Sequence, residues 1–177
     1  MKCKGCGESF KPTRKGQSLC KFECFKLYQQ KQFIKNAKKE RKEYYEKNKT
    51  ITQIKNEVKK IFQKWVRMRD KDKPCKACGN PKGKEWHGSH FKKAEIYSGV
   101  IFDERNCHKC CDKCNVFLNG NELMFREGLV AEFGEKWVKQ LEKDANKTRD
   151  YKWTRDELTA ISNNYKLKIK ELQNGSN

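Results

Sequence analysis

The segment from Asp103 to Gly120, DERNCHKCCDKCNVFLNG, gathers residue types that hold metal ions and move protons. It contains four cysteines, one histidine and three asparagines in eighteen residues. Cysteine thiolates spaced as C-x2-C bind zinc. An imidazole can accept a proton at neutral pH, and amide oxygens suit harder cations such as Mg²⁺. The segment could therefore support a structural zinc site, a polar site held in place by that zinc, or both.

A partner for these cysteines lies upstream, at Cys75-x2-Cys78. Two registers compete for the second half of a four-cysteine site, and the residues alone leave the choice open: Cys107/Cys110 and Cys111/Cys114. The stretch between the two halves has β-branched and aromatic residues broken by glycine, which favours a two-stranded hairpin. The sequence NVFLN after Cys114 then predicts a short helix that ends at Gly120.

A second set of cysteines lies at the N-terminus. Two pairs at knuckle spacing, separated by a turn-rich segment, predict a four-cysteine zinc finger with these ligands: Cys3, Cys6, Cys20 and Cys24. About 24 residues cannot build a hydrophobic core, so metal binding would supply folding free energy on the order of 10 kcal/mol. Four thiolates close the coordination shell, so we expect this finger to dock on nucleic acid or on the rest of the protein rather than to catalyse.

The composition indicates that the cysteines bind metal rather than form disulfides. The chain has 177 residues, a mean hydropathy of −1.11, and 35% hydrophobic against 37% charged residues. That length suits one large domain or two small ones. The start, MKCKGCGESF, has no apolar run, and no segment approaches the ~20 apolar residues of a membrane span. We therefore expect a protein of the reducing cytosol that does not enter membranes, where paired cysteines favour zinc.

Positive charge is concentrated in the N-terminal part of the chain. The net charge is +19, and residues 1–74 carry 23 Lys and Arg against 8 Asp and Glu, whereas residues 75–177 carry 19 against 15. A basic region of this strength suits a polyphosphate, because each phosphate contact releases condensed counterions. The alternative is a lysine-rich helix that only keeps the protein in solution. Together with metal modules, the charge favours nucleic acid as the partner.

Helices must position these groups. Residues 25–49 are nearly free of glycine and proline and predict a long basic helix that could follow a phosphate backbone or serve as a linker. Thr50-x-x-Gln53 is a capping box, and Thr154-x-x-Glu157 is another, before the last helix. Apolar residues recur at three- and four-residue spacing after Thr50, which predicts one buried face: Ile51, Ile54, Val58, Ile61, Phe62, Trp65 and Val66. From Leu123 onward the chain again predicts helix.

These elements predict a mostly helical α+β fold. Residues 1–24 would form the zinc finger, residues 25–49 the basic helical linker, and residues 50–177 a domain built around a zinc-stapled ββα core. The core would span residues 75–120, in the order knuckle, strand, loop, strand, knuckle, helix, with the other helices packed around it.

The ββα pattern resembles the HNH, or His-Me finger, nucleases. In those enzymes a histidine on the first strand, an asparagine in the loop and a metal ligand on the helix form the site, and by resemblance these are His90, Asn106 and Asn115. The second C-x2-C of zinc-stapled members typically begins five residues after the asparagine. That spacing selects Cys75, Cys78, Cys111 and Cys114 as the staple and leaves Cys107 and Cys110 as buried thiols or competing ligands.

The order of motifs along nearly the whole chain resembles the phage NinG (Rap) recombination endonuclease family. The matching pieces are RDKDKPC-x2-CG at residues 69–79, GSHF at 88–91, ERN-x-HK-x-C-x2-CN at 104–115, and WT-x-x-E at 153–157. The resemblance implies a nuclease that cuts branched DNA, such as Holliday junctions or D-loops, in the cytoplasm of an infected bacterial host. It also implies other recombination proteins as partners. Symmetric cutting of a junction would suit a homodimer.

Within this resemblance the residues take separate roles. His90 would be the general base, Asn106 would orient it, and Asn115 would ligate one catalytic Mg²⁺ or Mn²⁺, with Asn119 as a weaker second ligand. Such sites usually place Asp or His before the base histidine, where this chain has Ser89. His87 is the substitute ligand we predict, although strand alternation puts it opposite His90 unless Gly88 bends the chain.

Basic side chains would hold the DNA. We predict these contacts along the long helix and beside the second knuckle: Lys31, Lys35, Lys38, Lys39, Arg41, Lys42, Arg105 and Lys109. Two other functions remain open at this point. One is a zinc-finger protein that binds DNA or RNA without catalysis, and the other is a general HNH nicking endonuclease. Cleavage by wild-type protein but not by a His90→Ala variant would separate the enzyme from the binding protein.

Overall fold

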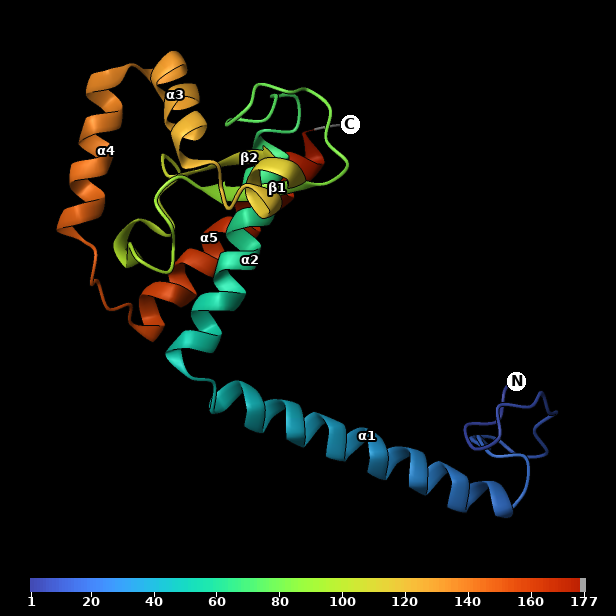
Figure 1. The fold of residues 1–177 in the computed structure, drawn as a ribbon. Coiled ribbons are helices and arrows are strands. Elements are labelled where there is room, and N and C mark those ends of the chain that lie inside the picture. The colour runs from blue at the N-terminus through green and yellow to red at the C-terminus, as the bar shows by residue number, and fades with distance from the viewer. Residues whose placement is uncertain (176–177) are drawn as a thin grey trace. The chain divides into compact units, whose positions relative to one another are not determined.

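The computed structural model describes residues 1–175, so the last two residues of the predicted 50–177 domain lie outside the described part (Figure 1). The chain divides into two compact units, Met1–Lys49 and Thr50–Asn177. The fold class is mostly helical α+β with one small two-stranded sheet, as the sequence predicts.

The first unit is built around its cysteines. A loop with a single bridge between Lys2 and Ser9 leads into α1 (Glu23–Lys47), the predicted basic helix. Cys24 is the only buried residue of α1, and the other side chains of that helix lie largely exposed. In the described residues no helix, this one included, combines the length and apolar character needed to cross a membrane.

The second unit contains the core of the first predicted helix pair. Helix α2 (Ile51–Arg69) and helix α5 (Arg155–Asn174) lie side by side in the second unit (Figure 1). Both begin at the predicted capping boxes, where Thr50 pairs with Gln53 and Thr154 with Glu157. Their facing apolar side chains form one cluster around Phe62, Trp65 and Tyr165. Of the predicted stripe, Ile51 stays exposed because it lies at the first position of α2.

The predicted hairpin is present. Strand β1 (Trp86–His90) pairs antiparallel with β2 (Cys107–Cys111), and the register places His90 opposite Cys107. The connection contains a short 3₁₀ turn, η1 (Ser98–Val100). Gly88 allows β1 to approach α2, because a Cβ at this position would lie 2.9 Å from the backbone of Gln63. The hairpin is thus pressed against the helix that carries the basic residues of the second unit.

A second core lies on the side of the cysteine knuckles. After β2 the chain makes one π-helical turn, η2 (Lys113–Phe117), where the sequence predicts a short helix. Helices α3 (Glu122–Phe133) and α4 (Glu135–Lys147) follow, and Gly134 between them has the positive φ of 87° that glycine adopts without strain. Phe125, Leu129 and Leu141 from these helices pack with Phe91 and with buried cysteines.

Candidate metal centres and an adjoining polar cavity

One four-cysteine cluster joins the two ends of the hairpin region. The Sγ atoms of Cys75, Cys78, Cys111 and Cys114 all lie within 4.8 Å of one another. The Cys78 and Cys111 sulfurs are 3.9 Å apart. Four thiolates at about 2.3 Å from a tetrahedral zinc would be about 3.8 Å apart, so the donor set fits zinc. The Cys111/Cys114 register is confirmed as the one that the fold assembles.

The backbone around this cluster has the features of a zinc knuckle. The Cys111 amide N–H donates to Cys75 Sγ at 3.3 Å, and the Gly79 amide N–H closes the first loop onto Cys75 O at 2.8 Å. Gly79 has φ +68°, a conformation that favours glycine. A hydrogen bond from the Cys110 thiol, together with these backbone amides, lowers the pKa of Cys75 to about 4 despite burial. Cys75 is therefore set up as a thiolate, the form that binds metal.

Cys107 and Cys110 lie outside the cluster and are fully buried. Cys107 packs in the core between α2 and α5, and Cys110 packs in the core against α3 and α4. Burial raises the pKa of Cys107 far above its usual value, so its thiol stays protonated. Of the two roles that the sequence leaves for these residues, the structure favours buried thiols.

The N-terminal cluster has the same geometry. The Sγ atoms of Cys3, Cys6, Cys20 and Cys24 also lie within 4.8 Å of one another, so this second set could hold zinc. Burial opposes ionisation of Cys3, but amide N–H groups of Cys20, Cys6 and Gly5 outweigh it and lower its pKa to about 6. Gly5 packs directly on Cys24, where any Cβ would collide with backbone.

A polar cavity of about 190 Å³ lies at the end of the hairpin beside α2. Three predicted site residues line it together: His90 from β1, Asn115 from η2, and Asn119 from the turn after η2. Helix α2 contributes Lys59 and Gln63, and the loop after β1 contributes Lys93 and Glu95. The cavity therefore combines an imidazole, two side-chain amides, a carboxylate and two ammonium groups.

The hydrogen bond of His90 fixes which ring nitrogen is free. Its Nε2 lies 2.8 Å from the carbonyl oxygen of Ile101, which accepts only from a protonated nitrogen. Nδ1 is then the unprotonated nitrogen of the neutral ring. Burial lowers the pKa of His90 below its ordinary 6.5, and the bond to Ile101 offsets this only in part. The ring is neutral at pH 7 and able to accept a proton.

The two cavity amides are held in different ways. The hydroxyl of Ser89, itself buried, donates to Asn115 Oδ1 at 2.5 Å and orients that amide. Asn119 is exposed and has φ +48°, within a run of left-handed residues that continues through Gly120 and Asn121. Asparagine tolerates this conformation better than most residues. Non-glycine residues in this region often mark functional loops.

Asn106 and His87 do not line the cavity. Asn106 is fully buried: its Oδ1 accepts from the Lys92 amide at 2.7 Å, and its Nδ2 donates to the carbonyls of Lys92 and Val100 at 3.0 Å. It holds the loop that carries the Ile101 carbonyl. His87 points to the opposite face of β1 from His90, as alternation implies, and its buried Nε2 has no hydrogen-bond partner in the described residues.

Two of the predicted DNA contacts are committed elsewhere. Lys109 is 5% exposed, and its ammonium donates to the Lys71 carbonyl at 2.7 Å, so it is unavailable to a phosphate. The Arg105 guanidinium forms ion pairs with Asp103 at 2.7 Å and Asp144 at 2.9 Å. Both long-range partners are invisible in the local sequence. The six predicted contacts on α1 are all exposed: Lys31, Lys35, Lys38, Lys39, Arg41 and Lys42.

Sequence reasoning missed the contribution of α2 and of Ser89 to the cavity. Lys59 and Gln63 lie between the apolar positions of α2, where a polar residue ordinarily faces solvent. Gly88 was the available signal, since a glycine inside a strand often marks close backbone approach. Here the Gln63 side chain donates to the Gly88 carbonyl at 2.9 Å.

Comparison with known proteins places the whole chain. The model of the family described as Bacteriophage Lambda NinG protein matches residues 1–175. The chain belongs to the NinG family. No solved structure matches this NinG-family chain.

Several curated NinG proteins are similar to this chain. Protein ninG of Escherichia phage 933W is 36% identical over 110 residues, which make up 62% of this chain and 53% of that protein. Protein ninG of Escherichia phage lambda is 34% identical over 110 residues, 62% of this chain and 52% of that protein. Protein ninG of Salmonella phage P22 is 35% identical over 109 residues, with 62% and 52% covered. The matched stretch thus spans about half the length of these NinG relatives.

Proposed function

We propose that this chain is a metal-dependent endonuclease that cuts branched DNA during phage recombination. The observation that carries the proposal is the cavity that brings His90, Asn115 and Asn119 together beside the four-cysteine cluster. These are an acid–base group and two neutral oxygen donors, and cationic side chains stand next to them. Phosphodiester hydrolysis needs such a set, because a water must lose a proton while negative charge grows on the phosphate.

In this proposal His90 is the general base. Its neutral ring and the Nε2–H···O=C bond to Ile101 leave Nδ1 to accept a proton from the attacking water. The lowered pKa keeps the ring in the accepting form throughout the neutral pH range. Asn106 is a positioning residue: it fixes the loop that carries the carbonyl partner of His90 and touches no reacting group.

The oxygen donors that line the cavity fit a hard divalent cation. Asn115, Asn119 and the Glu95 carboxylate are the residues that would hold it, and oxygen donors of this kind suit Mg²⁺ or Mn²⁺. Once bound, the cation would act as a Lewis acid on the phosphate and stabilise the leaving oxygen. Lys59, which pairs with Glu95 at 3.4 Å, and Lys93 would offset the remaining phosphate charge.

The arrangement of β1, β2 and η2 around one cysteine cluster supports an HNH-like core for this chemistry. The basic α1 supports DNA as the substrate, because its six predicted contacts are exposed along one helix. The preference for branched DNA comes from the resemblance to the recombination endonucleases, and a homodimer would supply the two active sites that symmetric cutting needs.

The decisive experiment compares His90→Ala with His87→Ala. Both variants remove a histidine from β1, but only His90 lines the cavity. We expect His90→Ala to lower the rate of Mg²⁺-dependent cleavage at least about a hundredfold, the usual cost of losing a general base. We expect His87→Ala to cut at close to the wild-type rate. Four-way junctions, flaps and linear duplexes of equal length serve as substrates, and junction affinity is measured in parallel.

Three results would count against the proposal. Wild-type protein that binds junctions tightly but cuts none of these substrates under Mg²⁺ or Mn²⁺ would indicate a DNA-binding protein without catalysis. Equal cutting of linear duplex and junction would indicate a general nicking enzyme. Loss of cleavage in His87→Ala but not in His90→Ala would place the site on the other face of the strand.

A further inference from the structure

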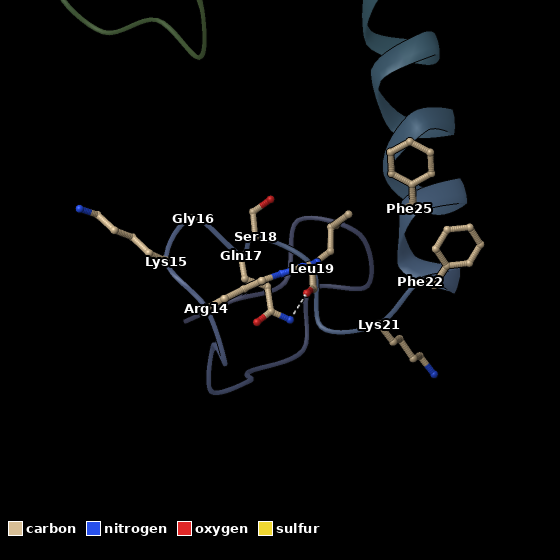
Figure 2. Close-up of a pocket in the computed structure, with 9 residues that line it drawn as sticks. All are labelled: Arg14, Lys15, Gly16, Gln17, Ser18, Leu19, Lys21, Phe22 and Phe25. Atoms are coloured by element: carbon tan, nitrogen blue, oxygen red, sulfur yellow. Dashed lines mark hydrogen bonds between the residues drawn. The ribbon is translucent and has the colours of Figure 1, made fainter.

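The N-terminal unit carries an open pocket that no part of the proposed nuclease site uses. It has a volume of about 540 Å³ and lies between the Arg14–Leu19 loop and the start of α1. Figure 2 shows the rings of Phe22 and Phe25 one above the other on the first turn of α1, across from that loop. The four-cysteine cluster holds both walls, because Cys20 precedes Lys21 and Cys24 lies between the two rings in sequence.

The two aromatic rings are open to solvent. Phe22 is 78% exposed and Phe25 is 43% exposed, and their near-parallel planes differ by 20° with centroids 6.3 Å apart. Within residues 1–175 the only ring contact of either is with the other. Phe22 makes no capping bond to α1. Two exposed rings in a unit without an oily core do little for folding, so they are available to a ligand.

The rest of the lining is basic. Arg14, Lys15 and Lys21 are exposed, none of them forms an ion pair within the described residues, and the lining contains no acidic side chain. The whole unit carries 15 Lys and Arg against five Glu. The matching ligand has flat apolar faces joined to negative charge. A nucleotide with an unpaired base has both, whereas the base faces of a duplex are covered by their neighbours.

We propose that this pocket binds an unpaired base of a single-stranded nucleic acid. The base stacks on Phe22 and Phe25, and the flanking phosphates lie beside Arg14, Lys15 and Lys21. Aromatic side chains next to cationic ones hold single strands in this way without sequence preference. The site goes beyond the proposed nuclease function, needs nothing from His90, and would direct the protein to DNA or RNA that exposes single-stranded segments.

The test measures binding by the full chain without added divalent cation. The probes are oligothymidine, oligouridine and a duplex of equal length, each single strand carrying one 2-aminopurine to report stacking. We expect Phe22→Ala and Phe25→Ala each to lower single-strand affinity about tenfold, the usual loss for one stacking ring, and to reduce the 2-aminopurine response. Phe33→Ala is the matched control, because Phe33 is 75% exposed on the same helix but outside the pocket.

Charge substitutions give an independent readout. Arg14→Ala, Lys15→Ala and Lys21→Ala should each reduce the slope of log K against log salt by about 0.7 for a single strand. The phenylalanine variants should leave that slope unchanged, because they remove no cation. Phe22→Tyr keeps a ring and should restore both the affinity and the 2-aminopurine response, and two bound zinc ions per chain would show that every variant is folded.

The outcomes separate this proposal from the nuclease. Equal single-strand affinity in Phe22→Ala, Phe25→Ala and Phe33→Ala overturns it, whatever the cleavage assays give. A change of oligomeric state in Phe22→Ala with unchanged strand binding also overturns it and assigns the rings to a second copy of the chain. Tighter binding of either single strand than of duplex, lost with the rings, supports it, and the preferred probe then identifies DNA or RNA as the source.

Discussion

Asn106 and Asn119 carry the same amide group in two different environments. Asn106 is fully buried and makes three hydrogen bonds to backbone groups of Lys92 and Val100. Asn119 is exposed, lines the cavity and has φ +48°. The structure therefore assigns the first to stability and, in our proposal, the second to the site itself.

This division can be measured with two substitutions. Asn106→Ala leaves one buried amide N–H and two carbonyls unpaired, so we expect the free energy of unfolding to fall by about 3 kcal/mol. Asn119→Gly removes the side-chain amide but suits the positive φ, so we expect unchanged stability and a cleavage rate that falls about tenfold or more. Urea unfolding gives the stability, and Mg²⁺ titration of cleavage gives the effect on the site.

A matched result would be informative in the opposite direction. If Asn119→Gly destabilised the fold as much as Asn106→Ala and cleaved normally, Asn119 would be a structural turn residue. A cleavage rate that saturates at higher Mg²⁺ in Asn119→Gly than in wild type would instead support a role in holding the cation.

Sequence spacing locates the site residues better than it locates DNA contacts. His90, Asn115 and the cysteine register lie within one hairpin, so local spacing constrains where they meet. Lys109 and Arg105 are in the same segment, yet their partners are Lys71 and Asp144. Those contacts depend on how α2 and α4 pack, which no local pattern contains. A surface lysine and a buried lysine therefore have the same appearance in the sequence.

At the scale of elements, β2 is unusual because all five of its residues are buried. His108 and Lys109 lie among them, and the end of α2 satisfies their polar groups. Arg69 pairs with Asp70 at 2.7 Å and reaches the Cys107 carbonyl at 2.9 Å, and Asp70 accepts from the Lys109 amide at 3.1 Å. This explains the RDKDKPC motif, whose first two residues tie α2 to the strand that carries the cysteine ligands.

His108 makes this junction sensitive to acid. Burial, reinforced by the Arg69 charge, lowers its pKa from 6.5 to about 4. The unfolded chain then binds more protons than the folded one between about pH 6.5 and 4, so stability from this group is complete above that window and is lost as pH falls through it. The shift corresponds to about 3 kcal/mol at most. We expect the free energy of unfolding to decline on acidification, and His108→Gln to decline less.

Glutamine is the suitable replacement because it can still donate to the Arg105 carbonyl, which His108 Nε2 contacts at 3.1 Å. Urea unfolding of both proteins at about pH 7.5 and 5.5 isolates the contribution, since His90 and the thiolates titrate alike in each. Parallel pH profiles for wild type and His108→Gln would show that this histidine is not the group responsible.

Helix positions follow closely from the sequence, whereas the segment after β2 does not. The capping boxes at Thr50 and Thr154 lie where the patterns place them, because their bonds are local. Lys113–Phe117 instead forms a π-helical turn rather than a regular helix. Cys114 must reach the other three sulfurs, and Asn121 donates to its sulfur at 3.5 Å from beyond the turn. Metal geometry thus overrides helical propensity at the element that carries Asn115.

For the whole molecule, the charge and the cores belong to different units. Every residue of the two hydrophobic clusters lies after Lys49, whereas residues 1–49 bury little besides the cysteine cluster. Those 49 residues nevertheless hold 15 of the 42 Lys and Arg of the chain. Stability of the second unit should therefore not depend on the first, whereas DNA affinity should.

A fragment of residues 50–177 tests this separation. It retains both cores, one cysteine cluster and the whole cavity, so we expect cooperative unfolding at nearly the wild-type denaturant midpoint and one bound zinc per chain instead of two. Without α1 it loses the exposed lysine row, so junction affinity should fall at least about tenfold and the dependence of log K on log salt should become shallower.

Cleavage by the fragment then shows what the first unit contributes. If α1 and the finger only raise the local concentration of DNA, the fragment should reach the full-length rate at saturating junction and low salt, with the loss confined to KM. A fragment that folds and binds yet cuts at a much lower saturating rate would mean that the first unit also helps to place the scissile phosphate. Junction affinity with the same salt slope as the full chain would instead remove α1 from the DNA interface and shift that role to the cations around the cavity.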